Sequence, residues 1–158
     1  MVTMNKPITI YTDGSARGNP GPGGYGAVLI SGKHRKEISQ GYRLTTNNRM
    51  ELLSVIVALE ALKLRGSEVT IYSDSKYVVE AVEKGWLKEW VKKDFKKKKN
   101  RDLWLRFLEV YKKHKVRFVW VKGHANNVEN NVCDQLAVEA SSLPNLLIDE
   151  VYENLKEE

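Results

Sequence analysis

Two segments of the sequence end alike, and each ends on an aspartate. Residues 9–13 read Thr-Ile-Tyr-Thr-Asp, and residues 70–74 read Thr-Ile-Tyr-Ser-Asp. In a strand, each aspartate shares a sheet face with the tyrosine two residues before it. If the strands are parallel neighbours, about 4.8 Å apart, Asp13 and Asp74 meet at one edge of a sheet. Carboxylates so close repel each other unless a cation lies between them, and oxygen ligands favour a hard ion such as Mg²⁺.

Each candidate residue, taken alone, also has a simpler explanation. Asp13 before a glycine is typical of a turn, and Asp74 before a serine is typical of a helix N-cap. Glu51 and Asp134 fall near the starts of predicted helices, where a negative charge interacts favourably with the helix dipole. His124 follows a predicted strand, and a lone loop histidine is usually just solvated. The single residues therefore leave both interpretations open.

The elements that must position these residues alternate between strands and helices. Strands are predicted at residues 7–12, 25–30, about 34–44, 69–73 and 116–121. Helices are predicted at residues 49–65, 75–84, 86–91, 101–113 and 130–142. The glycine-rich stretch 14–26 predicts a loop. This order indicates an α/β fold with a mixed sheet.

The charge distribution favours a polyanionic partner without proving one. The formal net charge is +6, and basic residues crowd one short stretch, namely Lys92, Lys93, Lys96, Lys97, Lys98, Lys99 and Arg101. Such a run is often only a solvated surface loop, and many basic proteins bind no nucleic acid. The C-terminal end, by contrast, is acidic.

Length and composition predict one compact, cytoplasmic domain. The chain has 158 residues and a single cysteine, Cys133, so no internal disulfide can form. No stretch approaches the roughly 20 apolar residues that span a bilayer. Residues 1–7 lack the apolar region of a signal peptide. We therefore expect no membrane partner, and we expect a reducing compartment.

Longer motifs connect these residues. Residues 11–15 read YTDGS and residues 18–26 read GNPGPGGYG; residues 45–52 read TTNNRMEL. Residues 73–78 read SDSKYV, residues 119–125 read VWVKGHA, and residues 129–134 read ENNVCD. In this order, over residues 8–142, the sequence resembles the type 1 ribonuclease H family, the bacterial-type ribonuclease HI family.

The resemblance implies a fold and an activity. The fold would be ribonuclease H-like, a five-stranded mixed sheet flanked by helices. The activity would be endonucleolytic hydrolysis of the RNA strand of RNA–DNA hybrids by two metal ions, leaving 5′-phosphate and 3′-hydroxyl ends. The ions would be Mg²⁺, for which Mn²⁺ can substitute. Four carboxylates would hold them, Asp13, Glu51, Asp74 and Asp134, and His124 would assist proton traffic or product release.

The resemblance also implies substrate contacts on both strands. Asn19, Asn47 and Asn48 match positions that read the RNA 2′-hydroxyl, and Lys76 stands where a glutamine often contacts RNA. Thr46 and Asn100 match two members of a pocket for a DNA phosphate. Trp86 and Trp90 match aromatic residues lining a DNA channel, although two tryptophans four apart on a helix are more often core. The lysines that would bind DNA phosphates are Lys96, Lys97, Lys98 and Lys99.

The sequence departs from the family pattern at several substrate positions. Leu44 replaces an arginine that often belongs to the phosphate pocket, and the adjacent Arg43 should face the other way on a strand. The basic stretch is shorter than in familiar bacterial members. The histidine loop continues as Asn-Asn-Val at residues 126–128, where a glycine and a proline are common. None of these departures affects the carboxylates.

Two other functions compete with hybrid cleavage. One is an integrase-like or junction-cutting nuclease of the same fold, and the other is a hybrid-binding module without activity. The TTNN motif argues against the first, and the complete set of carboxylates argues against the second, because a mere binder gains little from negative charge facing phosphates. We expect a monomer with a catalytic domain at residues 1–144. The acidic tail, residues 145–158, could be helical or disordered.

Overall fold

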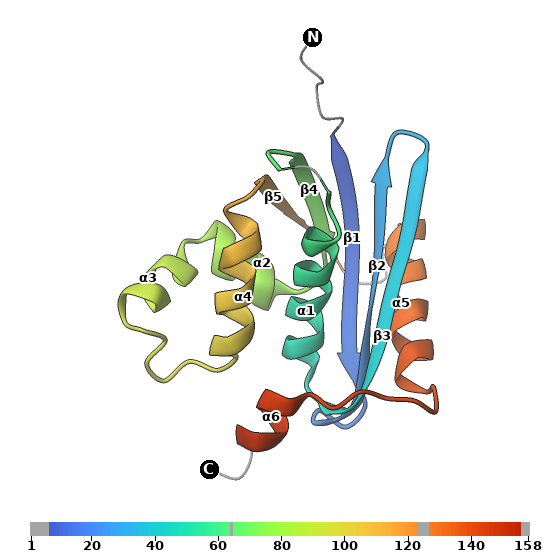
Figure 1. Ribbon diagram of the computed structural model, residues 1–158, viewed down its shortest axis with the longest axis vertical. Coiled ribbons are helices and arrows are strands. Elements are labelled where there is room, and N and C mark those ends of the chain that lie inside the picture. Colours follow the sequence, from blue (N-terminus) through green and yellow to red (C-terminus); the bar gives the residue numbers. More distant parts are fainter. Residues whose placement is uncertain (1–6, 64, 123–126, 156–158) are drawn as a thin grey trace.

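The computed structural model describes residues 7–63, 65–122 and 127–155. Its centre is a five-stranded sheet with the strand order β3-β2-β1-β4-β5 (Figure 1). The strands are β1 (Ile8–Ala16), β2 (Gly21–Ser31), β3 (His34–Thr45), β4 (Glu68–Ser73) and β5 (Lys115–Trp120). Neighbouring strands β1 to β3 are antiparallel, whereas β4 pairs in parallel with both β1 and β5. The predicted five-stranded mixed sheet is confirmed.

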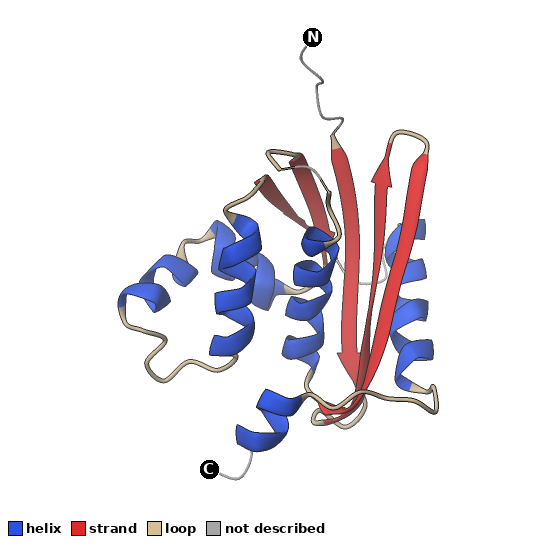
Figure 2. Ribbon diagram, viewed as in Figure 1, coloured by secondary structure: helices blue, strands red, loops and turns tan. Residues whose placement is uncertain are grey.

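Helices cover both faces of this sheet (Figure 2). They are α1 (Asn47–Glu60), α2 (Lys76–Glu83), α3 (Trp86–Lys92), α4 (Arg101–Tyr111), α5 (Val128–Ser141) and α6 (Glu150–Leu155). Helix α5 packs on β1, β2 and β3, while α1 packs on the opposite face and against α4. Among the helices of the described residues, none combines the length and the apolar character that crossing a membrane requires.

The two similar strand segments lie side by side. Strands β1 and β4 pair in parallel with Thr9 opposite Thr70 and Tyr11 opposite Tyr72. The two tyrosine rings stack with their centroids 5.0 Å apart. Because the register matches residue for residue, Asp13 and Asp74 follow at the same edge of the sheet.

The hydrophobic core lies between the sheet and helices α1 and α4. Leu52, Ile56 and Leu59 of α1 are completely buried, as are Trp104 and Phe107 of α4. Helix α1 is buried on several sides, as expected from its nearly continuous apolar sequence. It ends at Glu60 rather than at residue 65 as predicted, because the chain turns there toward β4, with Gly66 in a left-handed conformation.

The glycine-rich stretch is mostly strand, so the predicted loop over residues 14–26 is wrong. Only residues 17–20 connect β1 to β2. Gly24 and Gly26 lie under α5, where an added Cβ would come within 2.5 Å of the backbone oxygens of Ala137 and Cys133, respectively. These glycines allow a helix to approach the sheet closely instead of turning the chain. They thereby bring α5, which carries Asp134, close to β1 and β2.

The C-terminal segment, which we define as residues 143–155, packs along the end of the sheet. Leu147 forms a bridge to Tyr42 of β3, and its backbone oxygen accepts a hydrogen bond of 2.9 Å from the Arg43 N–H. Helix α6 follows, and its Glu153 pairs with Arg43 at 2.8 Å. The segment thus lies beside the start of α1 (Figure 1).

Candidate active site

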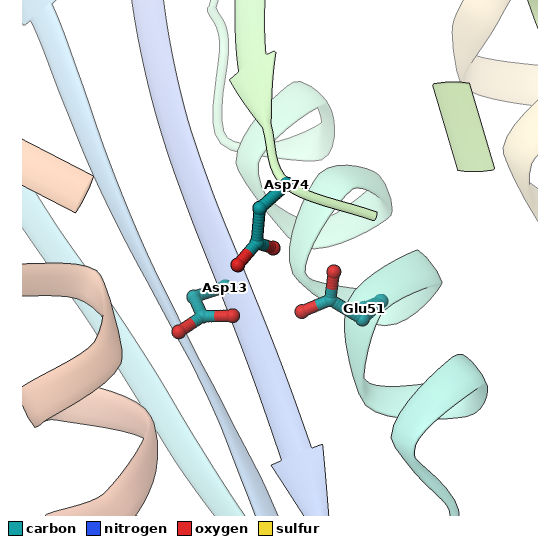
Figure 3. A group of neighbouring side chains, drawn as sticks. All are labelled: Asp13, Glu51 and Asp74. Carbon is teal, nitrogen blue, oxygen red and sulfur yellow. The ribbon is translucent and has the colours of Figure 1, made fainter. Parts of the chain in front are cut away.

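Three carboxylates from three elements come together at the end of β4. Asp13 comes from β1, Glu51 from α1, and Asp74 directly follows β4; their side chains converge on one space (Figure 3). One oxygen from each lies within 4.8 Å of the others. We call these three residues the acidic group. Clustered carboxylate oxygens are the donor set that Mg²⁺ and similar hard cations prefer.

Glycine at position 14 brings α1 close enough to β1 for Glu51 to reach the acidic group. An added Cβ at Gly14 would lie 2.5 Å from the backbone nitrogen of Glu51, so a side chain there would displace the helix. The Gly14 N–H instead donates a hydrogen bond to Glu51 Oε1. Both Asp13 and Gly14 belong to β1, so the turn interpretation of this pair is wrong.

Asp74 is not the helix cap that its neighbours suggested. Ser75 caps α2, because its Oγ accepts a hydrogen bond of 3.2 Å from the Val78 N–H. The backbone oxygen of Asp74 accepts a hydrogen bond of 3.2 Å from Trp120 Nε1. The backbone is therefore held from β5, while the carboxylate faces Asp13 and Glu51 (Figure 3).

Asp134 lies beside the acidic group without belonging to it. It sits more than one turn into α5 and is half-buried. Its carboxylate is close enough to Asp13 to raise the pKa of that residue. The preceding residue, Cys133, contacts the Tyr11 backbone oxygen through its Sγ at 3.2 Å, and this contact holds α5 against β1.

Burial and mutual repulsion disfavour the charged forms of these acids. The pKa of Asp13 is raised to about 7, chiefly by burial; the hydrogen bond with Glu51 lowers it, and the nearby carboxylates of Asp74 and Asp134 raise it. The pKa of Glu51 also lies well above its ordinary value, first because Glu51 is buried and second because Asp13 is close. Bound divalent cations would remove this penalty by offsetting the charge. The donor set therefore fits metal ions.

This electrostatic penalty predicts how the metal-free protein responds to pH. The folded-state pKa of Asp13 is about 7, above its ordinary value of 3.8. The stability associated with its protonated form is complete below the ordinary value and is lost as pH rises through the folded value. In EDTA, the Asp13→Asn variant should therefore unfold at a higher temperature than the wild-type protein at pH 8. The advantage should shrink toward pH 4.

Thermal unfolding followed by circular dichroism at several pH values checks this expectation. Mg²⁺ should raise the wild-type Tm more at pH 8 than at pH 5, because the ion replaces protons that are already gone at pH 8. It should raise the Tm of Asp13→Asn less. Equal unfolding temperatures of the two proteins across this range would contradict the burial of a charged Asp13.

The asparagines expected to contact RNA join two loops next to the acidic group. The Asn19 side-chain oxygen accepts a hydrogen bond of 2.9 Å from the Asn47 N–H. The Asn47 side-chain oxygen accepts one of 2.6 Å from the Ala16 N–H. These bonds connect the β1–β2 connection with the start of α1. Asn48, the second residue of α1, is exposed.

The residues expected to contact DNA lie around α3 and at the starts of α1 and α4. Thr46 caps α1, and Asn100 occupies the corresponding position before α4. Trp86 is exposed, whereas Trp90 is half-buried and packs edge-on against the core residue Trp104, with the ring centroids 5.7 Å apart. The alternative that these two tryptophans are core residues therefore holds in part for Trp90, and it does not hold for Trp86.

The lysines expected to contact substrate are exposed and lie beside aromatic rings. Lys76 Nζ lies 5.0 Å from the centre of the Trp120 ring, and Lys98 Nζ lies 5.2 Å from that of Trp90. Phe95, which the sequence did not single out, is only 4% exposed and fastens this segment to the core. The sequence signal that could have identified Phe95 was the presence of an aromatic residue inside a run of charged residues.

Two other features escaped the sequence analysis or lie outside the structure. Arg49 is almost fully buried and pairs with Asp102 and Asp149 at 2.7 Å each. The only sign of this buried ion pair in the sequence was a charged residue directly before the apolar part of α1. His124 lies outside the described residues.

Known proteins resemble the chain over nearly its whole length. Residues 5–142 match the model of the RNase H family. The chain is 54% identical to a protein named Ribonuclease H from Rippkaea orientalis, and the alignment covers 94% of each chain.

Solved structures show the same fold. LC9-RNase H1 superimposes with a TM-score of 0.78 at 29% identity, covering 99% of this chain and 84% of the other. LC11-RNase H1, solved in complex with an RNA/DNA hybrid, gives a TM-score of 0.64 at 30% identity, covering 84% and 95%. With its sheet order, its acidic group and these relatives, the chain belongs to the RNase H family.

Proposed function

We propose that this protein hydrolyses the RNA strand of RNA–DNA hybrids with the help of two divalent metal ions. The observation that carries the proposal is the acidic group, in which one oxygen from each residue lies within 4.8 Å of the others, at the carboxyl end of β4 and beside Asp13 of β1. The products would carry 5′-phosphate and 3′-hydroxyl ends. Family membership supports this activity.

The protein's own residues would hold the metal ions and orient the substrate. Asp13, Glu51, Asp74 and Asp134 would be the ligands of Mg²⁺, or of Mn²⁺ in its place. When bound, the ions supply an activated water and stabilise the charge on the leaving 3′ oxygen. The Gly14 N–H orients Glu51, and α5 brings Asp134 toward Asp13.

The substrate would lie across the loops and helices around the acidic group. RNA contacts are assigned to Asn19, Asn47, Asn48 and Lys76. Contacts to the DNA strand are assigned to Thr46, Asn100, Trp86, Trp90, Lys96, Lys97, Lys98 and Lys99. The exposed lysines and the net charge of +6 support a polyanionic partner. The complex of LC11-RNase H1 with a hybrid supports the choice of hybrid.

His124, which lies between β5 and α5 in the sequence, would assist proton traffic or product release. A general acid or base is not required when a metal ion activates the water. We therefore expect His124→Ala to be slower and still active. Unchanged turnover of this variant at every pH would remove the histidine from the proposal.

The proposal also covers the setting of the activity. We propose that the protein acts as a cytoplasmic monomer and that residues 1–144 form its catalytic domain. Residues 145–158 would be an acidic C-terminal tail that carries none of the proposed metal ligands. Gel filtration with light scattering tests the monomer, and truncation after residue 144 tests whether kcat depends on the tail.

A cleavage assay on three matched duplexes tests the function. One sequence is prepared as RNA–DNA hybrid, duplex DNA and duplex RNA, each incubated with Mg²⁺, Mn²⁺ or EDTA. We expect metal-dependent cleavage of the RNA strand in the hybrid alone, and products that a 5′-phosphate-dependent exonuclease degrades. Cleavage of duplex DNA would favour a related nuclease activity, and binding without cleavage would favour a binding module.

A further inference from the structure

The start of α1 contains a buried arginine whose donors are all engaged. The Arg49 side chain is 3% exposed. Its Nε and one terminal nitrogen donate to Asp149 at 2.7 and 2.9 Å, and both terminal nitrogens donate to Asp102 at 2.7 and 2.9 Å. The fifth donor reaches Asn100 Oδ1 at 3.3 Å. A guanidinium has five N–H donors, so this network leaves none for substrate.

Arg49 contacts both residues of the proposed phosphate pocket, Thr46 and Asn100. Its backbone N–H donates to Thr46 Oγ1 at 3.2 Å, and its guanidinium donates to Asn100 Oδ1. In each case Arg49 occupies the acceptor and leaves the donor free to point elsewhere. The donors are the Thr46 hydroxyl proton and the Asn100 N–H that Tyr77 does not take, and hydrogen-bond donors are what a phosphate oxygen requires.

The orientation of the Asn100 amide follows from its two neighbours. Arginine carries no acceptor, so the amide oxygen must face Arg49 and the NH₂ group must face away. One N–H of that group donates to the Tyr77 hydroxyl at 3.0 Å, which also accepts a hydrogen bond of 2.8 Å from Trp104 Nε1. The second N–H is then held in a defined direction.

Orientation matters more in this chain because neither Thr46 nor Asn100 carries a charge, and the hydrogen-bond partners that the structure describes for them are Arg49 and Tyr77. Leu44 stands where an arginine often completes the pocket, and the charge of Arg49 is offset by two carboxylates. The charges of Arg49, Asp102 and Asp149 sum to −1. Burial would raise the pKa of Asp102, yet the hydrogen bonds from Arg49 lower it overall, which keeps the carboxylate charged. Binding of the one phosphate between Thr46 and Asn100 must therefore depend on well-placed neutral donors, separately from the phosphates assigned to the exposed lysines 96–99.

Asp149 ties this arrangement to the C-terminal segment. It is 8% exposed and accepts hydrogen bonds from Arg49 and, at 2.8 Å, from the Thr45 hydroxyl next to Thr46. The backbone pairing of Leu147 with β3 holds the segment in place two residues earlier. A single carboxylate thus supports both sides of the pocket.

We propose that the C-terminal segment is a working part of the DNA-strand site, in which Asp149 holds Arg49 and Arg49 orients the donors of Thr46 and Asn100 toward a phosphate. Arg49 and Asp149 are then positioning residues that act without touching the substrate. The inference rests on the proposed function, because it specifies how that function's substrate is held.

Steady-state cleavage of a hybrid by Asp149→Asn tests the proposal. We expect KM to rise about tenfold, the cost of one misplaced hydrogen bond to a charged group, while kcat stays within about twofold. Asp149→Glu should recover part of the affinity because it keeps the charge. A purely electrostatic effect predicts the opposite sign, since removing a negative charge near a phosphate lowers KM. An unchanged or lowered KM would overturn the proposal.

A double-mutant cycle separates positioning from general loosening. In the Asn100→Ala background, Asp149→Asn should raise KM much less than it does in the wild-type background, because the amide it orients is gone. Glu153→Gln is the matched control: it breaks the pair with the exposed Arg43 in the same segment and leaves Arg49 intact. We expect it to change neither KM nor kcat. If the effects of Asp149→Asn and Asn100→Ala on KM were fully additive, Asp149 would not act through Asn100, and the proposal would be contradicted.

Folding is checked by circular dichroism, and kinetics are measured where each variant is fully folded. If Asp149→Asn does not fold, the same kinetic test is made with Arg49→Lys. A lysine ammonium cannot reach Asp102, Asp149 and Asn100 in the plane that the guanidinium provides. This variant should raise KM similarly, and an unchanged KM would overturn the inference. Absence of hybrid cleavage by the wild-type protein would refute the proposed function itself, which keeps the two failures distinct.

Discussion

Replacing Asp74 by asparagine is expected to lower the single-turnover rate of hybrid cleavage by at least about 10³-fold. Asparagine keeps the shape of the side chain and removes the charge that a divalent ion requires. Asp74 supplies one of the three oxygens that lie within 4.8 Å of one another. The residues assigned to phosphate binding lie on other elements, so the dissociation constant for hybrid should change by less than about threefold.

Single-turnover cleavage and fluorescence anisotropy measure the two quantities separately. Glu68→Gln is the matched control, because Glu68 is an exposed acid at the opposite end of the same strand. It should behave as wild type in both assays. Cleavage by Asp74→Asn at a near wild-type rate would refute the assignment of Asp74 as a metal ligand.

Neutralising the four lysines at residues 96–99 is expected to weaken hybrid binding about 100-fold at low salt. All four are exposed, and the buried Phe95 holds the segment in position next to Trp90. Lysines act as point charges on phosphates, so the loss should be similar for every hybrid sequence. Turnover at saturating substrate should fall far less, because the acidic group is untouched.

Salt titrations of the quadruple glutamine variant test whether these lysines meet phosphates. Each lost contact should flatten the slope of log affinity against log salt by roughly 0.7–0.9. A control variant removes the same charge elsewhere by changing four exposed lysines to glutamine, namely Lys33, Lys36, Lys63 and Lys115. Its slope should change much less. An unchanged slope in the first variant would identify the run as a solvated loop.

The meeting of Asp13 with Asp74 could be expected from a local repetition. The matching segments 9–13 and 70–74 place the two aspartates at one sheet edge on the condition that their strands are parallel neighbours, and the observed pairing of Tyr11 with Tyr72 meets that condition. The starts of two helices were also predicted to within two residues: α1 begins at Asn47 rather than at residue 49, and α2 begins at Lys76 rather than at residue 75.

The glycine-rich stretch was misread because glycine serves two purposes. It allows left-handed turns, and it also removes the Cβ where two backbones approach closely. Gly24 and Gly26 serve the second purpose under α5. The identity of the opposing helix, which starts more than 100 residues later, is not encoded near the glycines.

The pairing of Arg49 with Asp149 was missed for a similar reason. Their separation of 100 residues leaves no periodicity that connects them. A buried arginine needs charged partners, but the sequence offers many acids that could serve. Only the path of the C-terminal segment along β3 selects Asp149.

The separation of Arg49 from its partner has a consequence for the newly made protein. A ribosome adds about 5–20 residues per second, so the 100 residues between them take about 5–20 s to synthesise. Asp13, Glu51 and Asp74 are all present once residue 74 is made, and Asp102 follows at residue 102, whereas Arg49 lacks its second carboxylate until Asp149 is added. The three carboxylates of the acidic group are therefore encoded before Asp149. In the proposed positioning role, the donors of Thr46 and Asn100 are fully held only once Asp149 has been synthesised and has packed against Arg49.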